Sequence, residues 1–176
     1  MSEAESHNLR VLVWGPSTKN PSDDQVKFAE KRKQIKEALV AEGHEAYFSE
    51  DLVPKESSIP VNLHEAIQAR ESDAVVIVAS SHGAIGEVHE IGPLLGQKLL
   101  LWLPKAARKG FTDEGIRRYI DAAGGRSVFF GSEDLSACSL ALASVDFAND
   151  KRYLQAGIAA RIEDLKQVAP IKREKL

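Results

Sequence analysis

The chain has 176 residues, 43% of them hydrophobic, with 23 basic and 26 acidic side chains and a formal net charge of −3. This length suits a single domain with a substantial core, and the charge balance argues against a surface built to hold a nucleic-acid backbone or an anionic membrane. Cys138 is the only cysteine, which excludes an internal disulfide, and no apolar run reaches the roughly 18 residues of a membrane span, so we expect a cytoplasmic protein without a signal peptide.

Apolar runs and helical segments alternate along the chain. The runs predict five strands, at residues 9–14, 45–48, 73–80, 98–104 and 126–130. The segments between and after them predict helices, at residues 23–42, 62–71, 84–96, 112–123 and about 135–168.

A strand followed by a helix, five times over, predicts a doubly wound α/β sheet, because parallel strands need right-handed crossovers. Residues 74–79 and 99–103 are apolar at every position, as in central strands that are covered on both faces. We expect one flavodoxin-like domain over residues 1–176, with flexible tails at 1–8 and 170–176. Its five-stranded parallel sheet has the strand order 2-1-3-4-5 and helices on both faces.

Ligands of such sheets bind beyond the carboxyl ends of the strands, where the strand order reverses. The loops after the first and third strands, "GPSTKNPSDD" and "SSHGAIGE", meet at that point. Neither contains a G-x-x-x-x-G-K-[ST] or G-x-G-x-x-G motif, and "HEIGP" lacks the second histidine of H-E-x-x-H. We therefore expect no cofactor and no metal.

The helix predicted from residue 84 places two acids differently. At about 100° per residue, one side of this helix is an apolar arc made up of Ala84, Val88, Ile91, Leu94 and Leu95. Glu87 leans toward this arc and Glu90 toward water. Glu87 lies in the first turn, where unpaired N–H groups and the helix dipole keep a carboxylate ionised. A poorly solvated carboxylate is a usable nucleophile. The alternative is that Gly83 only makes a turn and both acids only complement the dipole.

The stretch "SDAVVIVASSHGAIGEVHEIG" resembles the core of the nucleoside 2-deoxyribosyltransferase-like family. In that family an apolar strand ends in a polar loop, followed by a glycine, three mostly small or apolar residues and a glutamate, and residues 83–87 match this run. "WGP" and "GQKLLLWLP" extend the resemblance over roughly residues 9–104. Sugar-nucleotide-binding groups and Toll/interleukin-1 receptor-like NAD-cleaving domains share much of this layout.

The resemblance implies cleavage or transfer of the N-glycosidic bond of a nucleoside, nucleotide or NAD-like substrate, with Glu87 as the nucleophile. Most transferases of the family carry an aspartate just before the glycine, where this chain has Ser81 and His82. His82 either protonates the leaving base or is a surface histidine. The alternative function, which the missing aspartate favours, is a non-catalytic nucleotide-sensing or signalling module with the same pocket.

We assign substrate contacts to the two loops, to the start of the second helix and to the second acid. These residues are Gly15, Pro16, Ser17, Thr18, Lys19, Asn62, Ser80, Ser81, Gly83 and Glu90. For the first loop the alternative is a helix cap at Ser22 or Asp23, with the remainder solvated. Arg32 lies on an apolar helix stripe, where it either snorkels to water or binds phosphate.

The predicted C-terminal helix carries an apolar stripe beyond the last strand. Its members are Leu154, Ile158, Ile162 and Leu165. We expect this stripe to pair with a second copy in a two-fold homo-oligomer, as the resemblance also implies. The alternative is a terminal helix that folds onto its own sheet.

Overall fold

A computed structural model describes residues 8–52, 58, 60–80, 88, 92, 95–105, 111–131, 133 and 139–168. Five strands form the sheet: β1 (Arg10–Trp14), β2 (Glu45–Phe48), β3 (Ala74–Val78), β4 (Leu99–Pro104) and β5 (Arg126–Phe130). The helices around it are α1 (Val26–Ala41), α2 (Ser49–Leu52), α3 (Val61–Glu71), the 3-10 turn η1 (Gly96–Lys98), α5 (Phe111–Ala122) and α7 (Ser139–Val168).

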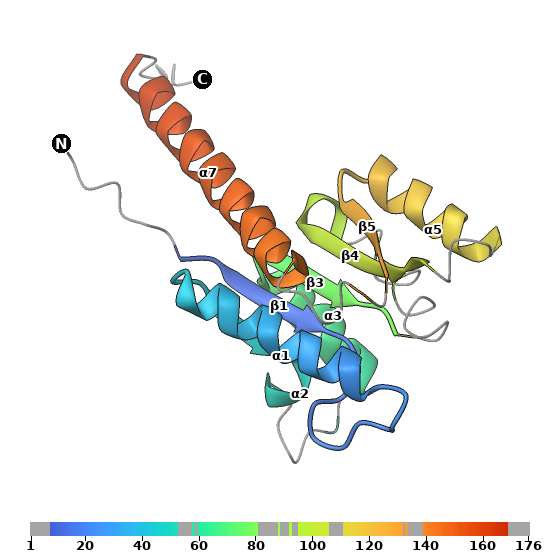
Figure 1. Cartoon of the computed structure of the whole chain (residues 1–176). Coiled ribbons are helices and arrows are strands. Elements are labelled where there is room, and N and C mark those ends of the chain that lie inside the picture. The colour runs from blue at the N-terminus through green and yellow to red at the C-terminus, as the bar shows by residue number, and fades with distance from the viewer. Residues whose placement is uncertain are drawn as a thin grey trace.

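The sheet is parallel throughout and has the order β2-β1-β3-β4-β5, which confirms the predicted flavodoxin-like arrangement (Figure 1). β1 lies between β2 and β3, with Val13 opposite Phe48 and Trp14 opposite Ile77. The chain therefore leaves β1 and β3 side by side at the same edge of the sheet. This is the point where the strand order reverses and where ligands of such folds bind.

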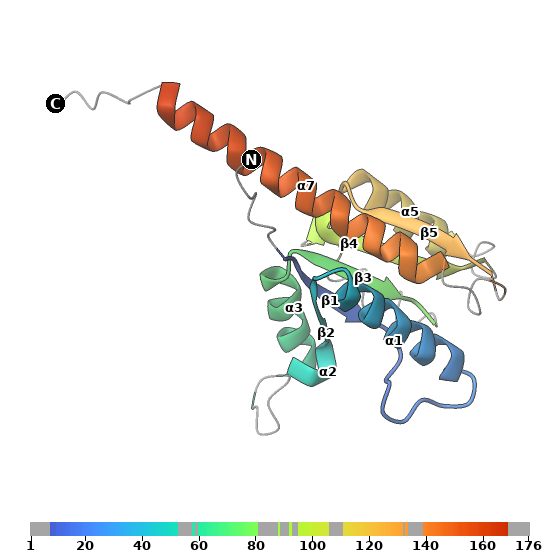
Figure 2. The same ribbon diagram turned by 60° about the vertical axis from the view of Figure 1, so that its left-hand side comes forward.

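Helices cover both faces of the sheet, as expected (Figures 1 and 2). On one face, α1 and the first half of α7 bury Ile35, Leu39 and Phe147 against the strands. On the other face, Ala69 of α3 and Ile120 of α5 join the second apolar cluster. All five residues of β3 are buried, because this strand is central and covered on both sides.

Helix α7 is much longer than the sheet that it packs on. Its first half is fixed by burial of Leu140 and Phe147 and by Trp102, whose Nε1 donates a hydrogen bond to Ser144 Oγ (3.2 Å). Its second half projects away from the body of the molecule (Figures 1 and 2). None of the helices in the described ranges is both long and apolar enough to cross a membrane.

Two details differ from the expected elements. Helix α1 begins at Val26 with Gln25 as its N-cap and has no side-chain cap, so neither Ser22 nor Asp23 caps it with its side chain. Instead, the backbone carbonyl of Ser22 accepts the N–H groups of Gln25 and Val26. The short helix α2, directly after β2, was not predicted.

A buried histidine joins the start of β1 to α7. His44 is 3% exposed, its Nδ1 accepts the backbone N–H of Leu9 (3.4 Å), and its Nε2 lies 3.3 Å from Asn149 Oδ1. This pattern requires the proton on Nε2. Burial is the main reason why the pKa of His44 lies below its ordinary value of 6.5; the Asn149 hydrogen bond opposes it, the Arg152 charge adds to it, and Glu42 opposes it.

We expect the free energy of unfolding to fall as the pH falls below about 6.5, because the unfolded chain binds a proton at His44 before the folded chain does. The contribution of neutral His44 is complete above its unfolded pKa and is lost as the pH falls through the lowered folded pKa. Urea unfolding of the wild type and His44→Gln, at about pH 7.5 and about pH 5.5, checks this. The variant should lose less stability on acidification than the wild type, and an identical loss in both proteins would contradict the assignment.

Candidate functional site

The loop after β1 leaves the sheet in close contact with the end of β3. Gly15 has a φ of +151°, and a Cβ atom there would lie 3.0 Å from the carbonyl oxygen of Val78 and 3.3 Å from Arg32 Cδ. Only glycine suits this backbone conformation and this approach. Ser80 follows Val78 by two residues and is half-buried. The structure therefore brings the first predicted loop beside the start of the second.

The other described residues of the first loop differ in exposure. Pro16 is buried, Thr18 is half-buried, and Ser17 and Lys19 are exposed. The hydroxyl of Ser17 accepts the backbone N–H of Lys19 (3.3 Å), which closes a local turn. Among the residues predicted to contact the substrate, Ser17 and Lys19 therefore have polar side chains at the surface, at the edge predicted to bind the ligand.

The side chain of Arg32, on α1, holds this loop in place through hydrogen bonds. It is 1% exposed and all five of its N–H donors are used. Its Nε and Nη2 donate to the carbonyl of Val13 (3.0 and 2.7 Å), and its Nη1 donates to the carbonyl of Pro16 (3.1 Å). The guanidinium also lies 4.4 Å from the ring centre of Phe48.

The remaining donors of Arg32 hold Glu50, in the unpredicted helix α2. The two carboxylate oxygens lie 2.8 Å from Nη1 and 2.6 Å from Nη2, in a bidentate ion pair. Arg32 therefore neither snorkels to water nor has a donor left for a phosphate, which corrects both expectations. The physical reason is that the end of β1 and helix α2 supply enough acceptors to satisfy a buried guanidinium.

Glu50 links the same ion pair to the loop. Burial raises the pKa of Glu50, but the hydrogen bonds and the charge of Arg32 outweigh burial and leave the pKa below its ordinary value. The carboxylate also accepts from Thr18 Oγ1 (3.4 Å). Arg32 and Glu50 together hold the first loop at the Pro16 carbonyl and at the Thr18 hydroxyl, so both are positioning residues.

Two buried polar atoms near the end of β1 find no hydrogen-bond partner among the described residues: Trp14 Nε1 and Gln68 Oε1. Trp14 is 7% exposed and is the last residue of β1. The Nε2 of Gln68, on α3, donates to the carbonyl of Ser49, which follows β2 (3.4 Å). Buried indole N–H groups usually have a partner. Neither residue was among the predicted site residues, although a tryptophan directly before "GP" at the predicted edge was a usable signal.

Several predicted site residues lie outside the described residues: Glu87, His82, Ser81, Gly83 and Glu90. The backbone of Asn62 lies in the first turn of α3, but its side chain is not among those that the structure describes. Because α3 connects the carboxyl end of β2 to the amino end of β3, its first turn lies at the edge of the sheet where the two loops emerge.

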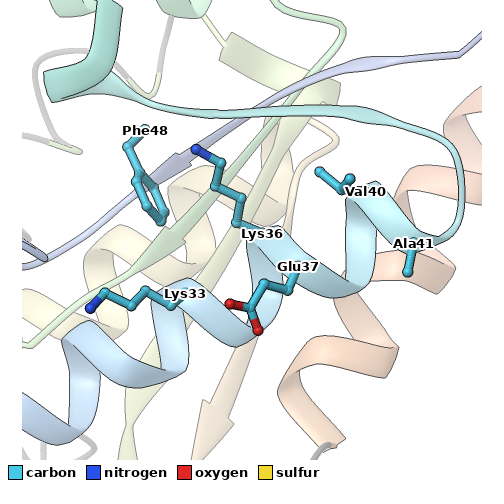
Figure 3. Close-up of a pocket in the computed structure, with 6 residues that line it drawn as sticks. All are labelled: Lys33, Lys36, Glu37, Val40, Ala41 and Phe48. Atoms are coloured by element: carbon cyan, nitrogen blue, oxygen red, sulfur yellow. The ribbon is translucent and has the colours of Figure 1, made fainter.

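A hollow of about 510 Å³ lies at a different place, on the outer flank of the sheet between α1 and the end of β2 (Figure 3). Its lining residues are Lys33, Lys36, Glu37, Val40, Ala41 and Phe48. Lys36 Nζ lies 4.2 Å from the ring centre of Phe48 and 3.2 Å from Asp51 Oδ2. β2 is an edge strand, so this hollow is not at the point where the strand order reverses.

The described parts of the chain contain no group of three or more His, Cys, Asp or Glu side chains placed to hold a metal ion.

No family model matches the chain, and no curated protein matches it. Among solved structures, it is similar to an oxidoreductase from Corynebacterium diphtheriae, with a TM-score of 0.49 and 15% sequence identity. The similarity covers 85% of this chain and 97% of that one.

Proposed function

We propose that the chain binds a nucleoside, nucleotide or NAD-like molecule between residues 15–20 and the loop after β3, and cleaves or transfers its N-glycosidic bond. The strand order carries this proposal, because it places both loops at one edge of the sheet. Gly15 lies against Val78, and the chain reaches Glu87 nine residues beyond Val78. The family resemblance supplies the reaction type.

In the proposed reaction, a carboxylate oxygen of Glu87 attacks the anomeric carbon of the sugar as the bond to the base nitrogen breaks. The electron pair of that bond goes to the base. The base of a nucleoside or nucleotide then takes a proton from His82, whereas the cationic nicotinamide of an NAD-like molecule leaves as a neutral molecule and needs no proton. The product on the protein is a glycosyl ester. Water or another base then attacks the same carbon, gives up its proton to His82, and releases Glu87 as a carboxylate.

The described residues have two supporting roles in this proposal. The Arg32–Glu50 ion pair keeps residues 15–19 in one conformation, which lowers the entropy cost of placing a substrate. Ser17 and Lys19, exposed at the same edge, contact the sugar hydroxyls or a phosphate. Trp14 Nε1 offers a further buried donor.

The experiment that tests the proposal is incubation of the protein with nucleosides, nucleotides and NAD, followed by chromatography for free base. Release of base from at least one member of the panel, absent without protein, supports it. A compound that binds in calorimetry but is recovered intact would instead favour the nucleotide-sensing alternative. A panel with neither binding nor base release would contradict the proposal.

Replacement of Trp14 by Phe removes the indole N–H donor but keeps an aromatic side chain, of smaller size, at the end of β1. If Nε1 donates to the ligand, the Kd for the best compound of the panel should rise about five- to tenfold, as for loss of one hydrogen bond. Trp102→Phe is the matched control, because Trp102 Nε1 is already bonded to Ser144 on α7. Calorimetric titration checks this, and an equal Kd for wild type and Trp14→Phe would remove Trp14 from the site.

A further inference from the structure

The projecting half of α7 exposes a set of large apolar side chains to water. Residues 153–163 are all exposed. The exposed fractions are 70% for Tyr153, 51% for Leu154, 52% for Ile158 and 47% for Ile162. A lone helix of this length is marginally stable in water, because most helices are stabilised by packing of an apolar face. We therefore expect another surface to pack against these apolar side chains and remove them from water.

The exposed stripe continues the face of α7 that packs on the sheet. Leu140, Phe147 and Leu154 are seven residues apart, and Ile158 lies one turn beyond Leu154 on the same face. Leu140 and Phe147 are each 1% exposed, because the sheet and α1 cover that part of the face. This apolar face of α7 is no longer covered where the helix extends beyond the end of the sheet.

The surface of this segment has the shape that a second helix fits. A hollow of about 340 Å³ runs along α7 beside Gly157, where a Cβ atom would meet nothing within 4 Å. Leu154, Gly157, Ile158 and Arg161, spaced i, i+3, i+4 and i+7, line it together with Tyr153 and Ile162. Four residues in this spacing form the hole that receives a side chain from a facing helix in a coiled coil.

We propose that this segment packs against the same segment of a second copy, as an antiparallel pair with its two-fold axis near Ile158. In this register Leu154 faces Ile162 of the other copy, and each Ile158 enters the hollow beside the partner's Gly157. The proposal does not rest on the proposed enzymatic function.

Two observations select the antiparallel arrangement. In a parallel pair, the apolar faces of the two α7 helices would meet along the whole helix. At Leu140 and Phe147, however, this face is already covered by its own domain, so the two domains would collide. Charge favours the same arrangement. The sheet-proximal end carries Asp150, Lys151 and Arg152, and the distal end carries Arg161, Glu163, Asp164 and Lys166. With the axis near Ile158, position 152 falls opposite position 164 and position 150 opposite position 166, which are oppositely charged pairs. An antiparallel pair places opposite charges together.

Light scattering of the full chain across micromolar concentrations tests the proposal. We expect a mass near twice the 19.2 kDa of one chain for the wild type. Ile158→Glu should raise the dimer dissociation constant at least about tenfold. Ala160→Glu is the matched control, because it adds the same charge at an exposed position on the opposite side of the same turn and should leave the mass unchanged. Circular dichroism checks that both variants keep their helices.

Disulfide cross-linking tests the orientation in a background where Cys138, the only native cysteine, is Ser. A mixture of Leu154→Cys and Ile162→Cys chains should cross-link to each other, and neither variant alone should do so. A monomeric wild type, an unaffected Ile158→Glu dimer, or cross-linking of Leu154→Cys alone would each overturn the proposal.

Discussion

Replacement of Glu87 by Gln is expected to slow base release at least about a thousandfold, because an amide oxygen does not form the glycosyl ester that the proposed reaction requires. Glu90→Gln should keep at least about a tenth of the activity, since Glu90 leans toward water on the predicted helix. Initial rates of base release from the best compound of the panel, measured by chromatography, check both values.

The Kd of the Glu87→Gln variant shows whether its activity is lost because the nucleophile is missing or because the pocket no longer binds the compound. Glu87→Gln should bind the same compound with a Kd within about threefold of the wild type, because the change keeps the size of the side chain. Equal losses of activity in the two variants, or a larger loss in Glu90→Gln, would mean that Glu87 is the wrong carboxylate.

Replacement of Glu50 by Ala is expected to lower the free energy of unfolding by about 3–5 kcal/mol, because it leaves the guanidinium of Arg32 buried without its counter-charge. Asp51→Ala is the matched control in the same short helix. Within the described residues, Asp51 pairs with the exposed Lys19 (3.9 Å) and the partly exposed Lys36 (3.2 Å), so its loss should cost less than about 1 kcal/mol. Urea unfolding at neutral pH measures both.

A double variant separates the ion pair from the rest of the packing. Arg32→Met combined with Glu50→Ala should lose clearly less stability than the sum of the two single changes, because each partner is costly mainly when the other is left alone. Losses for Glu50→Ala and Asp51→Ala that agree within about 0.5 kcal/mol would show that the ion pair does not hold the loop.

The fold was predictable because its strongest signals are local. Two runs are apolar at every position: residues 74–79 include all of β3, and residues 99–103 make up all of β4 except Pro104. The helical segments between the runs require parallel neighbours. Right-handed crossovers limit the possible strand orders but do not fix one, so the flavodoxin-like order was a choice among doubly wound arrangements, which the sheet confirms. The exposed stripe of α7 was also visible, because Leu154, Ile158 and Ile162 repeat beyond the last strand.

The ion pair between Arg32 and Glu50, which holds the first loop, was not predictable in the same way. Arg32 and Glu50 are 18 residues apart on different elements, and they meet only because β2 pairs with β1 and ends beside the loop. An arginine on an apolar stripe implies a buried acceptor, and the acid directly after the second strand was the available candidate. That Trp14 Nε1 has no hydrogen-bond partner among the described residues depends on the packing around the end of β1, which the spacing of residues in the sequence does not predict.

The measurement that tests the proposed site most directly is a crystal structure of the protein with a nucleoside bound, with Glu87→Gln used to prevent turnover. We predict the sugar between residues 15–20 and 80–83, with its anomeric carbon about 3–3.5 Å from a side-chain oxygen of residue 87. A nucleoside bound elsewhere, or a residue 87 that points into bulk solvent, would contradict both the enzymatic proposal and the nucleotide-sensing alternative.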